Sequence, residues 1–318
     1  MKTCAACHED LPKEKFSKKQ WKLNQRRCKA CVTDNREVHQ LPPTTNNKPD
    51  DNELDYNEII RLLDSIVIND ADLSPASDEE LFKQPPQKED CLICFLQMPS
   101  MWNGGHKYKS CCGKVICSGC IHANRLMMKG NTLCPFCRTP NLTSNEDRNE
   151  RYYARIAAGD AEAVFNYGVF YASGKHGYPK DCAKALELYA RAGKLGCAIG
   201  YHNIGNAYLH GNGVQRDKKK AKYYWELAAM GGDGMARHNL GLYEKKHGNM
   251  DRALKHFMIS ARVGHGKSLK EIKQLYTDEF ATKDDYSKAL RSYQEYLDEI
   301  RSDQRDKAAA FDNVYKYY

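Results

Sequence analysis

The sequence lacks any apolar run that approaches the roughly 20 residues of a membrane-spanning helix. Its N-terminal stretch, MKTCAACHEDLPKEKF, has no apolar region of the kind that secretory signal peptides carry. It contains no phosphate-binding loop of the form GxxxxGK followed by Ser or Thr, and no Ser/His/Asp or Cys/His constellation stands out beyond its paired cysteines. These absences argue against a membrane protein, a secreted protein and a nucleotide hydrolase. We therefore expect a cytoplasmic or nuclear protein.

Cysteine, by contrast, is abundant and paired. The 318 residues include 14 cysteines, in a chain that is 28% charged with a mean hydropathy of −0.74. Because reducing compartments keep thiols free, clustered pairs favour metal ligation over disulfides. Three of four central pairs have the C-x2-C spacing that turns both thiolates toward one tetrahedral zinc. Eight thiolates therefore predict two four-coordinate sites. Such sites have no open coordination position. The four pairs are Cys91 with Cys94, Cys111 with Cys112, Cys117 with Cys120, and Cys134 with Cys137.

A further four-thiolate set lies near the N-terminus. Cys4 with Cys7 and Cys28 with Cys31 fit one structural zinc, which brings the expected total to about three per chain. This region resembles an STC-like zinc domain in its elements C-x2-C, LP-x3-FS, QW and CK-x-C. The resemblance implies that residues 1–40 are a binding module without a reaction of its own. Its basic residues could meet nucleic-acid phosphates or an acidic partner, whereas a merely solvated face is the simpler alternative.

Residues 41–88 have the composition of a linker. They are acidic and rich in Pro, Asn and Ser, so they hold too little apolar surface to order themselves, and we expect this stretch to be largely disordered. One island at residues 56–67 has helical apolar spacing. This short helix either docks on the protein's own zinc or helical domain or serves a partner as a ligand.

The order of paired ligands in residues 89–140 resembles the RING finger of ubiquitin ligases. By that resemblance, the first and third cysteine pairs bind one zinc and the second and fourth pairs bind the other. The sequence departs from the common pattern at Lys114, where many RING fingers place a histidine, but the all-cysteine RING variant puts its fourth ligand at the position of Cys112. Since adjacent Cys111 and Cys112 make a tight arrangement, His106 remains an alternative ligand for one of them.

The same resemblance implies a surface for a ubiquitin-conjugating enzyme. RING fingers supply no nucleophile; they hold a charged conjugating enzyme and favour transfer of ubiquitin to a substrate lysine. Ordinary loop packing and a solvated arginine are the alternatives, since some RING-like folds never contact ubiquitin. The residues that would form the apolar groove and the bridging cation are Ile93, Ile121, Leu126, Pro135 and Arg138.

Residues 150–318 are repetitive. The dipeptides Tyr167-Gly168, Ile204-Gly205 and Leu240-Gly241 recur at spacings of 37 and 36 residues, each followed by an aromatic residue and then by a second helical stretch. These units resemble SEL-one-like repeats, relatives of the tetratricopeptide class. Stacked helix pairs of this kind form an α-solenoid with an extended protein-binding face and a charged terminal cap.

The sequence therefore predicts a mainly α-helical protein in which a repeat solenoid follows two small zinc-stabilised domains and an acidic linker. Our leading hypothesis is a RING-type ubiquitin ligase that recruits a conjugating enzyme through the zinc finger and a substrate or partner through the repeats. The alternative is a non-enzymatic zinc-binding adaptor, with a chromatin or nucleic-acid link through its N-terminal module. We expect no membrane association.

Overall fold

The computed structural model describes residues 2–3, 10–11, 74, 76–86, 89–100, 104–128 and 133–317. The chain divides into two compact units, residues 1–59 and 60–318. In the first unit, β1 (Lys2–Thr3) pairs antiparallel with β2 (Asp10–Leu11).

Two predictions for the N-terminal part of the chain lie outside the described residues. The first is the zinc site of the N-terminal module, whose expected ligands are Cys4, Cys7, Cys28 and Cys31. The second is the helix expected at residues 56–67. The structure tests neither the four ligands nor the helix, so both stay predictions.

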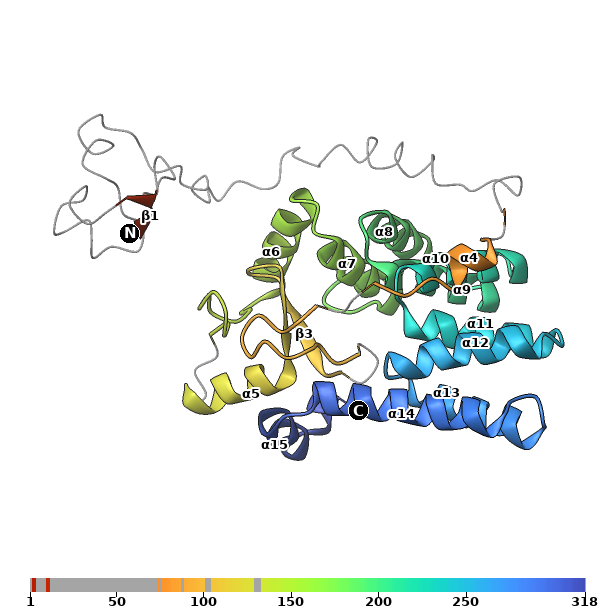
Figure 1. Cartoon of the computed structure of the whole chain (residues 1–318). Helices are drawn as coiled ribbons and strands as arrows, with labels where there is room; N and C mark the ends of the chain where they lie inside the picture. Colours follow the sequence, from red (N-terminus) through yellow and green to blue (C-terminus); the bar gives the residue numbers. More distant parts are fainter. Residues whose placement is uncertain are drawn as a thin grey trace, which may run out of the picture. The chain divides into compact units, whose positions relative to one another are not determined.

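Helices dominate the second unit, as Figure 1 shows. After α6 (Asn145–Ala157), eight helices follow one another, and each packs on the next in the chain. This arrangement confirms the mainly α-helical class and the solenoid of helix pairs. The eight helices are α7 (Ala161–Ser173), α8 (Cys182–Lys194), α9 (Ala198–His210), α10 (Lys218–Met230), α11 (Gly234–Lys246), α12 (Met250–Arg262), α13 (Gly266–Thr277) and α14 (Lys283–Ile300).

Aspartates begin four of these helices. The side chains of Asp160, Asp181, Asp217 and Asp233 each accept a hydrogen bond from a backbone amide in the first turn of α7, α8, α10 and α11. Such a cap satisfies an amide that has no partner within the helix. The recurring aspartate is therefore a local reason why each helix starts where it does.

The recurring glycines allow each helix pair to pack closely. A Cβ atom on Gly168, Gly205 or Gly241 would lie 2.9, 2.5 or 2.4 Å from an aromatic ring of the following helix. The rings belong to Tyr189, Trp225 and Phe257. Since real Cβ contacts are not this short, the absence of a side chain at these positions lets a large buried ring fill the interface between the paired helices.

The cysteine-rich domain is small and has little apolar core. A hairpin of β3 (His106–Lys109) and β4 (Lys114–Cys117) leads directly into α5 (Ser118–Met127). Its buried cluster consists of four cysteines together with Met98 and Ile116. A domain built in this way depends on something other than hydrophobic burial for its stability.

The helices contact the cysteine-rich domain from two sides, and β3 and α5 lie between α6 and α15 (Asp303–Phe311) in Figure 1. On one side, Tyr108 donates a hydrogen bond to Asp160 at 2.7 Å. On the other side, α15 packs along α5, and Ser118 donates to the carbonyl of Tyr315 in the 3-10 turn Asn313–Tyr315. The chain beyond the last repeat thus returns to the cysteine-rich domain.

Part of the stretch expected as a linker is ordered. The helix α4 (Asp78–Leu81) lies against α10, and Leu81 is completely buried there. A few side chains supply these contacts within an otherwise polar segment; the prediction that residues 41–88 are largely disordered stays a prediction. Among the described residues, the helices are all too short or too polar to span a membrane.

Candidate metal centre

Two loops with the same backbone geometry present four of the cysteines. In the loop that begins at Cys91, the amide of Phe95 donates to the Cys91 carbonyl at 2.8 Å, and Phe95 has a φ of 56°. In the loop that begins at Cys134, the amide of Arg138 donates to the Cys134 carbonyl at 3.0 Å, and Arg138 has a φ of 63°. An isolated antiparallel bridge closes each loop. We call these the first and second knuckles; each turns both of its sulfurs to the same side.

The remaining cysteines come from the hairpin and from α5. Cys111 and Cys112 lie in the turn between β3 and β4, whereas Cys117 ends β4 and caps α5 by accepting a bond from the amide of Cys120 at 3.5 Å. The chain therefore alternates between the two clusters. A metal ion bound at one cluster would close a loop that contains cysteines of the other, so two bound ions would constrain each other's loops.

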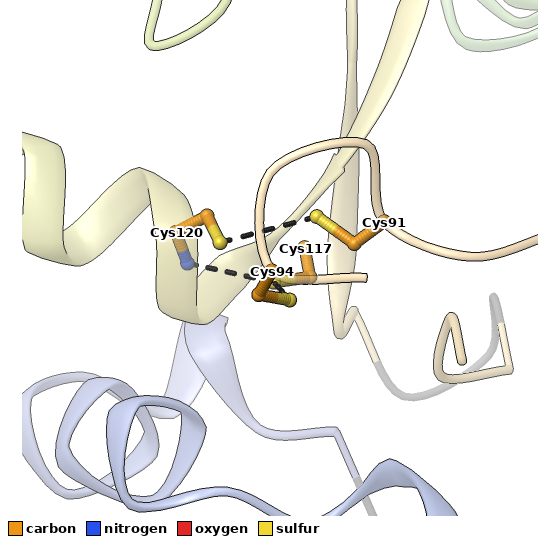
Figure 2. Close-up of side chains that lie close together, drawn as sticks. All are labelled: Cys91, Cys94, Cys117 and Cys120. Carbon is orange, nitrogen blue, oxygen red and sulfur yellow. Dashed lines mark hydrogen bonds between the residues drawn. The ribbon is translucent and has the colours of Figure 1, made fainter. Parts of the chain in front are cut away.

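The sulfur atoms form two groups of four, and within each group all lie within 4.8 Å of one another. Figure 2 shows the first group, with its side chains directed toward a common centre. The groups are Cys91, Cys94, Cys117 and Cys120, and Cys111, Cys112, Cys134 and Cys137. Both Cys111 and Cys112 are in the second group. His106, the alternative ligand, is in neither group of the described residues.

Sulfur–sulfur distances test whether these groups fit a metal. In the second group, Cys111 and Cys137 are 3.4 Å apart and Cys112 and Cys134 are 3.9 Å apart. In the first group, Cys94 lies 3.7 Å from Cys117, and Cys91 lies 3.9 Å from Cys120. Four sulfurs placed about 2.3 Å from a tetrahedral ion would be about 3.8 Å apart, whereas a disulfide needs about 2.05 Å. The described cysteines are all free thiols. The two groups could therefore each hold a metal ion.

The electrostatics of the groups point the same way. Burial raises the pKa of Cys112 to about 11 and raises that of Cys111 further. Without a cation these two thiols stay protonated at neutral pH, whereas contacts with Thr139 outweigh burial and lower the pKa of Cys137 to about 6. A divalent ion reverses that balance, because metal ligation requires the thiolates and releases their protons.

Arg305 lies directly beside the first group. Its guanidinium is fully buried and donates to the carbonyls of Gln97 at 2.8 Å and Ile300 at 2.6 Å. The same guanidinium lies 3.8 Å from the sulfur of Cys94. A buried cation here would offset the negative charge of a four-thiolate site. Sequence patterns missed this residue, because Arg305 is in a charged C-terminal helix far from every cysteine.

The residues expected to contact a conjugating enzyme are only partly gathered. Ile121 and Pro135 line one hollow of about 190 Å³ beside α5 and the second knuckle. Ile93 is 36% exposed and Leu126 is 63% exposed, and neither lines this hollow. Arg138 is exposed and donates a hydrogen bond to the side chain of Asn124 at 3.0 Å. The described geometry thus brings Ile121 and Pro135 together and does not place all five side chains in a single groove.

Asn124 links the second knuckle to α5, and sequence reasoning did not identify it. Its amide donates to the carbonyl of Leu133 at 3.0 Å while its oxygen accepts from Arg138. Together with the turn that sets the Arg138 backbone, this pair of bonds fixes where the guanidinium leaves the domain. An asparagine in an exposed-looking helix gives no signal of this role.

The family comparison concerns the helical part of the chain. The family model for the Sel1 repeat matches residues 161–197 and 198–233. This chain contains Sel1 repeats. The two matched units span α7 to α10 and end at Asp233, so the repeat boundaries coincide with the aspartate caps that begin α7 and α11.

Curated relatives match over short stretches. The ERAD-associated E3 ubiquitin-protein ligase component HRD3B of Arabidopsis thaliana is 32% identical over 99 residues, which is 31% of this chain and 15% of that protein. Cytochrome c oxidase assembly factor 7A of Xenopus laevis is 36% identical over 72 residues, which is 22% of this chain and 31% of that protein. The chain thus spans less than a third of the length of either relative.

Solved structures with weak overall similarity include two repeat proteins. The Sel1 repeat protein from Oxalobacter formigenes is 29% identical, with 48% of this chain and 64% of that chain covered and a TM-score of 0.42. The antigen c5321 of uropathogenic Escherichia coli, which displays an SLR fold, is 20% identical, with 61% and 40% covered and a TM-score of 0.41.

Proposed function

We propose that this protein is a RING-type ubiquitin ligase whose cysteine-rich domain binds a charged ubiquitin-conjugating enzyme and whose Sel1 repeats bind the substrate or a partner. One observation carries the proposal: two four-sulfur groups in which the first cysteine pair joins the third and the second pair joins the fourth. That alternation is the ligand order expected of a RING finger.

Zinc is the metal that suits these groups best. Four thiolates at tetrahedral spacing match its preferred donor set, and closed sites of this kind are structural. When bound, zinc would neutralise the crowded thiolates and stabilise a domain with almost no apolar core. Four thiolates would complete each tetrahedral site and leave no coordination position for water or substrate. The chemistry of transfer would then belong to the conjugating enzyme.

Two exposed apolar side chains of the cysteine-rich domain support a role in binding a conjugating enzyme. Ile93, next to the second cysteine of the first knuckle, and Leu126, near the end of α5, are large apolar side chains that water reaches. Apolar side chains at such a surface contribute binding energy when a partner covers them. Ile121 and Pro135 would add the walls of the neighbouring hollow.

Arg138 would act as the bridging cation. Its left-handed backbone and its bond to Asn124 fix the start of the side chain, so less conformational entropy is lost when the guanidinium binds. A planar guanidinium can donate to two acceptors at once, which suits a position between the conjugating enzyme and ubiquitin. The side chain would orient the partners and take no part in bond making.

The repeats would supply partner recognition. Stacked helix pairs expose long surfaces that bind proteins, and the Sel1 units of this chain are of that type. The Arabidopsis relative is named as a component of an E3 ubiquitin-protein ligase, which supports a similar setting for the repeats here.

Transfer assays test the proposal directly. With a panel of conjugating enzymes, the purified chain should modify itself, and Ile93→Ala and Arg138→Ala should each lower the rate at least tenfold. Metal analysis should find unchanged zinc in both variants, because neither side chain is a ligand. Leu195→Ala, at an exposed leucine of the repeats, provides a matched control that should leave the rate unchanged.

The metal content separates the outcomes. About three zinc ions per chain are expected, two of them bound by residues 91–137 and the third by Cys4, Cys7, Cys28 and Cys31. A chain that contains zinc but transfers no ubiquitin with any conjugating enzyme would instead favour the adaptor function. The contacts of the cysteine-rich domain with helices on both sides give that second candidate its support, since they make the domain part of a larger scaffold.

A further inference from the structure

A segment of this chain lies on the repeats in the manner of a bound peptide. The four-residue helix α4 lies against α10 in Figure 1, and its side chains also reach α12. An isolated helix of this length is not stable in water, so its contacts with the repeats must account for its order. A capping box between Ser77 and Glu80 shapes its first turn.

Leu81 is the apolar anchor of the segment. It is fully buried in a cluster that includes Trp225 of α10 and Leu240 of α11. The other buried members of this cluster are alanines of α10 and α11, whose small side chains leave space for the leucine. The repeats therefore offer a socket for one branched aliphatic side chain.

Phe82 lies among cationic and aromatic groups of α12. Its ring centre is 4.7 Å from the ring of His256, and the charged groups of Arg252 and Lys255 each lie 5.4 Å from its ring. Cations over an aromatic face are favourable, and more so where water is partly excluded. This second socket selects an aromatic side chain directly after the leucine.

Charge complements the two sockets. The first turn of α4 is acidic, and Asp78 forms an ion pair with Arg252. Arg237 of α11 is 1% exposed, and none of its guanidinium nitrogens has a hydrogen-bond partner in the described chain. Its charge lies close enough to His256 to help lower the pKa of that histidine, after the larger effect of burial. The groove also holds two acids, Glu244 at 3.5 Å from Arg252 and Glu226 in the lining of the hollow, so its preference for an acidic side chain is local to the position beside Arg252.

The segment does not fill the groove. A hollow of about 580 Å³ remains between the segment and α10, with Glu80 and Lys83 on one side and Tyr223 and Leu227 on the other. The cis contacts thus come mainly from three side chains: Asp78, Leu81 and Phe82. A ligand that makes the same three contacts and also fills this hollow would bind more tightly than the segment itself.

We propose that this groove over α10 and α12 is a peptide-binding site for partner segments that carry an acidic residue three positions before a Leu-Phe pair, and that residues 77–82 occupy it in cis as a displaceable ligand. The chain would then limit its own partner binding. A partner must compete with a tethered segment whose local concentration is high, so only a better fit or a high partner concentration opens the site. This inference concerns binding alone and does not depend on ubiquitin transfer.

A labelled peptide of residues 74–86 tests the site in the full chain. We expect weak binding to the unaltered chain and at least tenfold tighter binding to a chain with Leu81→Ala and Phe82→Ala, because those changes release the cis segment. A peptide with the same two changes should not bind. Adding Arg252→Glu to the opened chain should weaken binding of the natural peptide at least tenfold.

A second variant that releases the segment provides a test if the double alanine variant does not fold. Asp78→Arg changes a side chain that is 60% exposed and places it against Arg252, so it should release the segment without altering the apolar sockets. Equal peptide binding by opened and unaltered chains would contradict occupation in cis. Failure of both folded, opened chains to bind the peptide, or equal binding of the altered peptide, would overturn the site itself.

Discussion

Arg305 is a single residue that joins the cysteine-rich domain to the helices, because its guanidinium donates to carbonyls on both sides. We predict that Arg305→Met destabilises the protein by about 3 kcal/mol, because it leaves buried carbonyls of Gln97 and Ile300 without donors and removes a cation beside Cys94. Urea denaturation measures the loss. Zinc should also pass faster to a chelator.

Arg301 offers a matched control for this change, one turn earlier in the chain. It is 72% exposed in an ion pair with Asp306. Because exposed pairs contribute little, Arg301→Met should alter stability by less than about 0.5 kcal/mol. If both variants proved equally stable, the buried guanidinium would have no structural role.

Acid should destabilise the repeats through a buried histidine. Burial lowers the pKa of His256 to about 3, below the usual 6.5 of the unfolded chain. As the pH falls through 6.5, the unfolded state therefore takes up a proton that the folded state excludes, and stability decreases until the pH nears 3. At pH 5 one such histidine costs about 2 kcal/mol.

The variant His256→Leu separates the contribution of this histidine from that of the cysteine thiolates, whose protonation in acid would also lower stability. Neither ring nitrogen of His256 has a hydrogen-bond partner among the described residues, so the change breaks no such bond. Urea denaturation between pH 7.5 and 5 should show a smaller loss of stability for His256→Leu than for the natural chain. Parallel slopes would mean that His256 does not contribute.

The cysteine spacing predicted eight thiolates for two sites, and the resemblance to a RING finger supplied their division into the two groups that the structure brings together. Arg305 and Asn124 could not be found in this way. Each acts through a contact that depends on how separate elements pack, and a charged or polar residue in a helix is most often solvated. Local pattern therefore identified the ligands but not the side chains that surround them.

Among the elements, each helix pair depends on a glycine opposite an aromatic ring. We predict that Gly205→Ala destabilises the protein by about 2 kcal/mol, since the added Cβ would lie 2.5 Å from the ring of Trp225. In an exposed helix the same change would stabilise by about 1 kcal/mol. Thermal unfolding followed by circular dichroism distinguishes the two signs.

A double-mutant cycle identifies the ring as the cause. In a Trp225→Ala background the ring is absent and only the carbonyl oxygen of Ala221 stays close, at 3.0 Å, so Gly205→Ala should then cost much less. A similar loss in both backgrounds would assign the effect to the helix backbone instead. The repeat period alone indicated close contact at this glycine, but the partner ring became evident only from the packing of α9 on α10.

For the whole molecule, the sequence predicted a succession of domains but not their mutual contacts. Composition and repeats distinguish the cysteine-rich domain from the solenoid. Neither pattern indicates that α15 packs on α5, or that Arg155 of α6 donates to the carbonyl of Cys111 at 2.9 Å. Such long-range contacts join residues 44 to 211 positions apart. They depend on the path of the solenoid, which sums small rotations over every repeat.

These contacts predict that metal and repeats stabilise each other. Removing zinc with a chelator should lower the melting temperature of the repeats by about 5 °C, because the unfolded cysteine-rich domain no longer supports α6, α14 and α15. Trp225, in the core of the repeats, reports this transition if the other tryptophans, Trp21 and Trp102, are changed to Phe. In a variant with Arg155→Met and Tyr296→Phe, which removes donors to Cys111 and Ser100, the shift should be smaller. If zinc leaves and the Trp225 transition does not move, the two parts are energetically independent despite their contacts.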